Sequence, residues 1–282
     1  MVKKVAGNVY IYLILFLMYL PILFLMVFSF TDAPITGMWN GFTLRLYRDV
    51  FLHSKIMPAL LNTLLIASVS ALIATLLGTL GAIGVFYMKK RPKQVFETIN
   101  EIPVVNADVV IAISLALLFK ITVDSFANIG ITLSNNNFVT LLIGHVVLTI
   151  SFVYLNVKPK LQQMDPNDYE AALDLGAKPM LALVKVVIPA ILPGIISGFM
   201  LAFTLSLDDF IITSFLRDKS FDTLSTYVQG VIVKSTIPAE LRALTSYIFL
   251  VTSLIVVANG RKKKSKAKER ASKRAMIRKG AR

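Results

Sequence analysis

The sequence predicts an all-α membrane protein with six transmembrane helices, and three observations carry this prediction. The chain is 56% hydrophobic and only 16% charged, whereas soluble domains average about 45–50% apolar and about 25% charged residues. The apolar residues gather in runs close to the length of about 20 residues that a helix needs to cross a bilayer. Lys and Arg residues are concentrated between alternate runs, as is typical of the cytoplasmic segments of membrane proteins.

Each predicted span is an apolar run with polar residues at its ends. The six runs cover residues 9–30, 60–88, 103–122, 138–157, 190–215 and 241–258. The first contains Pro21, which membrane helices tolerate, and it has no small-residue cleavage site, so we expect a retained span. The second has Gly, Ser and Ala at intervals of three and four, which favours close packing in a bundle. The third is weaker, because Asn106 and Asp108 interrupt it.

We expect residues 1–260 to form one transmembrane domain, followed by a basic tail at residues 261–282. If the N-terminus is cytoplasmic, the predicted inner segments hold most of the 30 Lys and Arg residues. This distribution predicts a multi-pass protein of the cell membrane with both termini in the cytoplasm. Much of the +14 net charge lies in the tail beside a span, where membrane lipid is a better partner than nucleic acid.

Several kinds of chemistry are absent from the sequence. With no cysteine, disulfides and thiolate catalysis are excluded. The chain has no G-x-x-x-x-G-K-[ST] motif, so we do not expect it to bind ATP through a P-loop. We therefore predict no catalytic residue, no metal site and no cofactor in this chain, and a protein that is not itself an enzyme.

The polar segment at residues 158–189, between the fourth and fifth spans, predicts a short helix beside the membrane. Asp165 and Pro166 suit a helix start, and Asp168 and Glu170 put negative charge in the first turns, where the helix dipole favours it. One face of this helix is formed by Tyr169, Ala172, Leu173 and Gly176. Helices that rest on anionic headgroups usually carry Lys and Arg on their polar face. The acidic first half therefore favours a protein partner over the alternative of a lipid-bound helix.

This segment resembles the EAA loop of the permease subunits of ABC importers. The matching residues are Glu170-Ala171-Ala172, then Gly176 after three residues, and finally residues 186–189 (VVIP), where Val and Ile replace the usual Ile and Leu. The resemblance implies the type I ABC importer permease fold. It also implies a coupling helix that contacts a separate ATPase through Asp168, Tyr169, Glu170, Ala171, Ala172, Leu173 and Gly176.

The same resemblance implies a set of partners. ATP and Mg would be bound by a dimer of ABC ATPase subunits, and a second, homologous permease subunit would complete the path. Residues 39–43, 108–119, 205–210 and 236–240 resemble the C-type subunit of spermidine/putrescine permeases. They imply polyamine cargo that is delivered by an extracytoplasmic binding protein.

Three aspartates are candidates for the path of a cationic cargo. Asp208 and Asp209 lie late in the predicted fifth span, and Asp108 lies in the third. A carboxylate inside a span costs about 2.5–3.5 kcal/mol on insertion scales, which suggests a function. The alternatives are structural: Asp208 or Asp108 caps a helix, or Asp209 pairs with Arg217 or Lys219. We expect His145, alone in an apolar run, to be a hydrogen-bonded packing residue.

Two other functions remain open on the sequence alone. The same importer type could carry another small solute, such as an iron chelate or a phosphonate. A channel or secondary transporter that needs no ATPase is the more distant alternative. It would leave the polar segment at residues 165–189 without a purpose.

Overall fold

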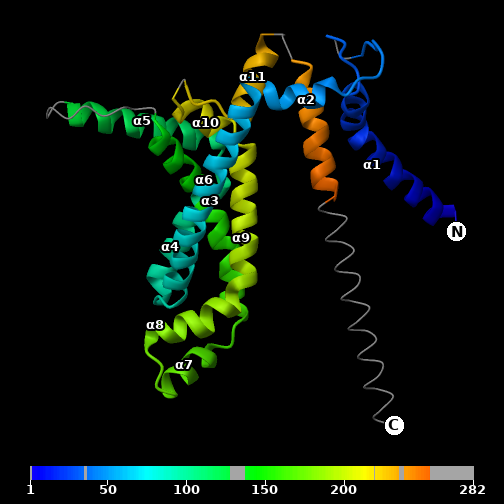
Figure 1. Cartoon of the computed structure of the whole chain (residues 1–282). Coiled ribbons are helices and arrows are strands. Elements are labelled where there is room, and N and C mark those ends of the chain that lie inside the picture. Colours follow the sequence, from blue (N-terminus) through cyan, green and yellow to red (C-terminus); the bar gives the residue numbers. More distant parts are fainter. Residues whose placement is uncertain (1, 35–36, 128–136, 219, 235–237, 255–282) are drawn as a thin grey trace. The chain divides into compact units, whose positions relative to one another are not determined.

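The computed structural model describes residues 2–34, 37–127, 137–218, 220–234 and 238–254, and every regular element among them is a helix (Figure 1). Five helices in these ranges are long and apolar enough to cross a membrane: Gly7–Phe28, Ile56–Phe86, Asp108–Phe126, Phe138–Gln163 and Pro179–Asp208. Residues 240–254 form a shorter helix where the sequence predicts the sixth span. Residues 255–258 and the predicted basic tail lie outside the described residues. The predicted all-α class is confirmed.

The chain forms two compact units, and residues up to 57 belong to the first together with those from 231 onward. Its described helices are α1 (Val2–Phe28), α2 (Arg45–Leu52) and residues 240–254. The ring of Tyr247 packs edge-on against Tyr47 and Phe51, at centroid distances of 5.2 and 5.5 Å. The Arg242 guanidinium donates a hydrogen bond to the carbonyl oxygen of Ala33 at 2.6 Å. These contacts join the last helix to α2 and to the loop after α1.

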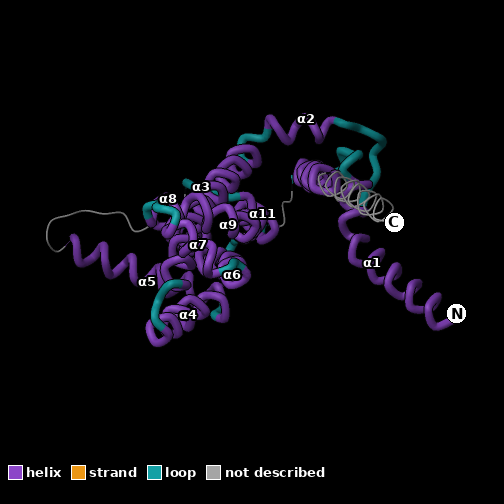
Figure 2. The backbone as a smooth tube through the Cα atoms, turned by 90° about the horizontal axis from the view of Figure 1, so that it is seen from below, coloured by secondary structure: helices purple, strands orange, loops and turns teal. Residues whose placement is uncertain are grey.

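The second unit covers residues 58–230. Its helices are α3 (Ile56–Phe86), α4 (Lys90–Val105), α5 (Asp108–Ala127), α6 (Phe138–Gln163), α7 (Pro166–Asp174), α8 (Pro179–Ala182), the π-helical turn η1 (Leu183–Val187), α9 (Ile188–Asp208), α10 (Ile211–Leu216) and α11 (Leu224–Val233). Figure 2 shows α3, α6 and α9 gathered in the middle of this unit, where they share one core.

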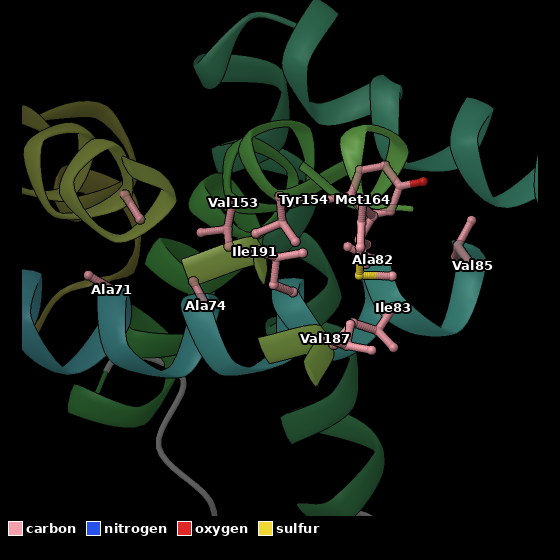
Figure 3. Packing of buried hydrophobic residues seen from close by; sticks show 13 residues of the cluster. Ala71, Ala74, Ala82, Ile83, Val85, Val153, Tyr154, Met164, Val187 and Ile191 are labelled. Carbon is pink, nitrogen blue, oxygen red and sulfur yellow. The ribbon is translucent and has the colours of Figure 1, made fainter. Parts of the chain in front are cut away.

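The core of the second unit depends on small residues in α3 and α9. Val153 of α6 is fully buried and packs with Ala71 and Ala74 of α3 (Figure 3). A Cβ atom at Gly78 would lie 2.9 Å from the Cβ of Val153, and one at Gly198 would lie 3.2 Å from its Cα. The two glycines thus let α3 and α9 approach α6 closely. The predicted close packing of the second span is confirmed at these positions.

The opposite face of α3 carries large apolar side chains that are exposed among the described residues of this unit. Leu61, Leu72, Leu76 and Leu80 are each 57–61% exposed, and their spacing places them on one side of the helix. A row of exposed leucines of this length is unfavourable in water. It is the surface expected of a helix that contacts lipid.

The third and fifth spans differ from the prediction. Residues 103–122 do not form one helix, because α4 ends at Val105, Asn106 is extended (ψ 146°), and α5 begins at Asp108. The fifth span begins at Pro179 rather than at residue 190 and ends at Asp208. The predicted ends of these two spans are wrong, because hydropathy does not show where the hydrogen bonding of a helical backbone stops. The short helices α2, α10 and α11 were not predicted.

Candidate functional site

Helix α7 has the start and the end that the sequence predicts for the segment after the fourth span. The Asp165 carboxylate accepts a hydrogen bond from the Asn167 N–H at 3.0 Å, and Pro166 occupies the first turn. At the other end, Gly176 adopts φ +84°. Its N–H donates to the Leu173 carbonyl at 2.8 Å, while the Ala177 N–H donates to the Ala172 carbonyl at 3.0 Å. This is the Schellman pattern, in which a glycine reverses the chain after the last helical turn.

The predicted contact residues of α7 divide between two faces. Tyr169, Ala172 and Leu173 are half-buried against their own unit. The residues exposed to a partner are Asp168, Glu170, Ala171 and Gly176. Beside them Leu175 is 89% exposed. The free surface of α7 therefore combines acidic side chains with a bare leucine at the helix end.

Tyr169 connects α7 to the end of α3. Its ring centroid lies 5.5 Å from that of Tyr87, the residue directly after α3. Burial, with a smaller contribution from the neighbouring Tyr169, raises the pKa of the Tyr87 hydroxyl above its ordinary value. The Tyr87 hydroxyl therefore stays uncharged at neutral pH.

The three candidate aspartates line one cavity of about 410 Å³ in the second unit. Its walls are formed by Asp108, Leu148, Phe152, Leu205, Asp208, Asp209, Phe210 and Ile211. The volume falls within the range of about 300–1,000 Å³ that is typical of small-molecule sites. Two interruptions of helical structure meet there: α5 begins at Asp108, and α9 gives way to α10 between Asp208 and Ile211. Irregular backbone at such places is a common feature of transporter binding sites.

The three carboxylates have different surroundings. Asp108 and Asp208 are exposed, whereas Asp209 is 9% exposed. Asp209 accepts the N–H groups of Ile212 and Thr213, at 3.2 and 2.8 Å, and the Thr213 hydroxyl at 2.8 Å. The carboxylate that closes the first turn of α10 is thus that of Asp209. The predicted alternatives, capping by Asp208 or pairing of Asp209 with Arg217, are wrong.

Arg217 instead forms an ion pair with Asp222. Lys219, the other suggested partner of Asp209, lies outside the described residues.

His145 lies behind the cavity and is fully buried in α6. Its Nδ1 is 2.7 Å from the Ser206 hydroxyl, and its Nε2 is 3.0 Å from the Thr213 hydroxyl. Ser206 in turn lies 3.0 Å from the Ser70 hydroxyl of α3. The prediction of a hydrogen-bonded packing histidine is confirmed. The sequence did not predict the hydrogen bonds of Ser70 and Thr213, because the only signal at each position was a hydroxyl in an apolar segment.

The chemistry of the cavity suits a cation with apolar parts. Carboxylates attract ammonium groups most strongly where water is scarce, and the aromatic faces of Phe152 and Phe210 can receive both cations and methylene groups. The end of α9 also lines the cavity through Leu205 and Asp208, and the C-terminal end of a helix favours positive charge.

Residues 74–260 match the family model described as the binding-protein-dependent transport system inner membrane component. The chain is 30% identical over 242 residues to the spermidine/putrescine transport system permease protein PotC of Escherichia coli (strain K12), covering 86% of this chain and 88% of that protein. PotC of Haemophilus influenzae is 30% identical over 250 residues, covering 89% and 93%. The putrescine transport system permease protein PotI of Escherichia coli (strain K12) is 30% identical over 239 residues, covering 84% and 83%.

Among solved structures, the chain resembles a bacterial ABC transporter involved in the import of the acidic polysaccharide alginate. The TM-score is 0.72 at 16% identity, with 91% of this chain and 93% of that one covered. At this identity the likeness establishes the fold alone, which is the predicted one.

Proposed function

The chain belongs to the binding-protein-dependent transport system inner membrane component family, and from this premise we propose that polyamines such as spermidine and putrescine are its cargo. As a family member it is the permease subunit of an ABC importer and a multi-pass membrane protein. Its role is transport rather than catalysis.

The observation that carries the cargo proposal is the meeting of Asp108, Asp208 and Asp209 at one cavity. A polyamine carries an ammonium group at each end and apolar methylenes between them. Carboxylates from α5 and α9 match the first feature, and Phe152, Phe210 and Leu205 match the second. An uncompensated group of carboxylates in a span is costly, so cationic cargo gives these residues a purpose. The 30% identity to polyamine permeases supports the same assignment.

We assign the exposed surface of α7 to the ATPase. Glu170 and Leu175 are exposed at the end of the segment that carries the EAA pattern, and Tyr169 joins this segment to α3. A dimer of ABC ATPase subunits, which would bind ATP and Mg, would press on α7 from the cytoplasm. With α7 on that side of the membrane, we propose that the N- and C-termini are cytoplasmic as well.

Two further partners complete the proposed machine. A second, homologous permease subunit would supply the other half of the path. An extracytoplasmic binding protein would deliver the polyamine, a role supported by the alginate transporter, which has been solved with its substrate-bound periplasmic protein.

Uptake of radiolabelled spermidine tests the proposal. The chain would be expressed with its ATPase, second permease and binding protein in cells that lack their own polyamine uptake. We expect saturable uptake that excess putrescine inhibits and that an iron chelate or a phosphonate does not. Uptake of either of those solutes without spermidine uptake would assign the importer another cargo. Spermidine flux that persists without the ATPase would instead indicate a channel or secondary transporter.

A further inference from the structure

His145 is a buried titratable group that the proposed path leaves without a role. It is fully buried, and both of its ring nitrogens are engaged by hydroxyl groups from other helices. Ser206 belongs to α9 and Thr213 to α10. Its Nε2 is also 3.6 Å from the Oδ2 atom of Asp209. The imidazole therefore lies next to a side chain that lines the cavity.

The hydrogen bonds of Thr213 determine which imidazole nitrogen carries a proton. A threonine hydroxyl has one hydrogen to donate. Thr213 donates it to Oδ2 of Asp209 at 2.8 Å. In its contact with His145, 3.0 Å long, the Thr213 oxygen must therefore accept. The donor there is Nε2–H.

The other nitrogen then acts as an acceptor. A buried imidazolium would have to give up its hydration, which is unfavourable in a protein interior, and the nearby Asp209 carboxylate is already occupied by three donors. The neutral ring avoids this cost. In that form Nδ1 accepts from the Ser206 hydroxyl at 2.7 Å, and Ser206 accepts from Ser70 at 3.0 Å, a shorter contact than the 3.3 Å between the Ser70 hydroxyl and its other acceptor, the Ala67 carbonyl. A single direction of donation then runs from Ser70 through Ser206 to His145, and from His145 through Thr213 to Asp209.

We infer that His145 is a positioning residue for the cavity: in its neutral form, protonated on Nε2, it fixes Thr213 and thereby the Asp209 carboxylate. Asp209 is held in addition by the Ile212 and Thr213 amides, and its own carbonyl accepts the Ser225 hydroxyl at 2.7 Å. Fixing Asp209 fixes the backbone between α9 and α10. The exposed carboxylate of Asp208, one residue earlier, is thereby presented to the cavity.

The three aspartates of the cavity then have different roles. Asp209 is the anchor, because its carboxylate is already occupied by three donors. Asp108 and Asp208 remain for the cargo. This division rests on the proposed function only in taking the cavity as the cargo's site.

Three substitutions of His145 separate a positioning role from simple packing. A glutamine amide nitrogen reaches about as far as Nε2 and can donate to Thr213, an asparagine reaches only to the Nδ1 position, and a leucine keeps the volume without polar atoms. We expect His145→Gln to keep the half-saturation concentration for spermidine within about threefold of wild type. His145→Asn and His145→Leu should raise it about tenfold at equal amounts of assembled transporter, because Thr213 loses the hydrogen-bond donor and a buried polar group is left without its partner. Equal half-saturation in all three variants would overturn the inference.

Nuclear magnetic resonance of ¹⁵N-labelled histidine reads the proton position directly. The chain has only two histidines, and His53→Asn keeps an acceptor for the Lys55 amide that His53 binds. When this chain alone is labelled and is assembled with unlabelled partner subunits, His145 gives the single signal. We expect a neutral ring with Nε2 protonated in the assembled transporter. Thr213→Val should change the Nε2 signal and Thr213→Ser should restore it. A doubly protonated ring, or one protonated on Nδ1, would overturn the inference. This measurement needs no transport, so a wrong cargo would abolish spermidine uptake in wild type while leaving the histidine signal as expected.

Discussion

The ring of Tyr169 lies against that of Tyr87, with centroids 5.5 Å apart and planes inclined by 46°. Tyr169 stands on the short helix that the EAA pattern marks, and Tyr87 follows the last residue of α3. The same end of α3 packs with α6 and η1 in the core of the second unit. If the proposed ATPase moves α7, this pair of rings would transmit the movement to α3.

Removal of the Tyr169 ring should weaken coupling without preventing assembly. An aromatic pair contributes about 0.5–1.5 kcal/mol beyond the area that it buries. We expect Tyr169→Ala to lower the amount of spermidine imported per ATP hydrolysed in the reconstituted transporter several-fold. Tyr169→Phe keeps the ring and serves as the matched control. An alanine variant with an unchanged transport-to-ATPase ratio would remove the pair from the coupling path.

The contact should not depend on pH in the physiological range. The pKa of Tyr87 is raised above 10.0, mainly by burial, so the folded protein holds this proton more tightly than the unfolded chain does. The stability that the neutral form provides is complete below about pH 10 and is lost as the pH rises through the raised value. We expect the difference in coupling between wild type and Tyr87→Phe to be constant from about pH 6 to about pH 9. A change within that window would show that the hydroxyl ionises there.

Substitution of Gly176 should disturb the end of α7 through the backbone alone. Nothing lies within 4 Å of a Cβ at this position, but its φ is +84°. Alanine in a left-handed conformation costs roughly 1–2 kcal/mol, and asparagine costs less. Gly176→Pro would also remove the N–H that binds the Leu173 carbonyl. We expect the ATPase that co-purifies with the chain to decrease in the order glycine, asparagine, alanine, proline. Equal recovery in all four would mean that this turn does not shape the docking surface.

The cavity aspartates should respond differently to substitution. Asp108→Asn and Asp208→Asn remove charge from exposed carboxylates, so we expect each to raise the half-saturation concentration for spermidine. Asp209→Ala removes the acceptor for two amides of α10, which typically costs about 0.5–2 kcal/mol. It should lower the yield and thermal stability of the assembled transporter. Identical uptake defects at equal stability in all three would contradict the division between anchor and cargo ligands.

Two glycines of α3 provide a matched test of the packing. A methyl group at Gly78 would lie 2.9 Å from Val153, whereas one at Gly81 meets nothing within 4 Å. We expect Gly78→Ala to destabilise the protein by about 1–3 kcal/mol through overpacking. Gly81→Ala should be neutral or should stabilise by up to about 1 kcal/mol, because alanine favours the helix. Thermal unfolding of the purified transporter in detergent would distinguish the two.

Hydropathy predicted where the membrane helices lie, but not where they are interrupted. The predicted fifth span begins at residue 190, directly after Pro189. In the structure Pro189 is the second residue of α9, separated by one residue from the π-helical turn η1, and the helix continues through both. A wider turn of this kind accommodates a local irregularity. The turn lies where the chain contacts α7 and α8, and hydropathy carries no signal for it.

The residues of the candidate site could be predicted from the sequence, but their individual roles could not. Ionisable residues within apolar segments identified all three cavity aspartates, because their cost in lipid makes them conspicuous. The sequence could not tell which of them was free. Asp209 differs from Asp208 in its partners, because it accepts from the Ile212 and Thr213 amides, three and four residues later in the chain. Thr213 in turn contacts His145, 68 residues away in the chain, and this long-range contact leaves no local signal.

The unbroken run from Pro179 to Asp208 has a mechanical consequence. Its 30 residues form a helical segment roughly 45 Å long that reaches from the segment beside α7 to the cavity. A tilt of about 5° around its middle would displace each end by about 2 Å in opposite directions. Ser206 lies almost at the far end, 2.7 Å from His145, and a hydrogen bond does not survive a stretch of that size. A tilt of this size, too small to unpack any helix, would thus break the hydrogen bond that holds one wall of the cavity in place.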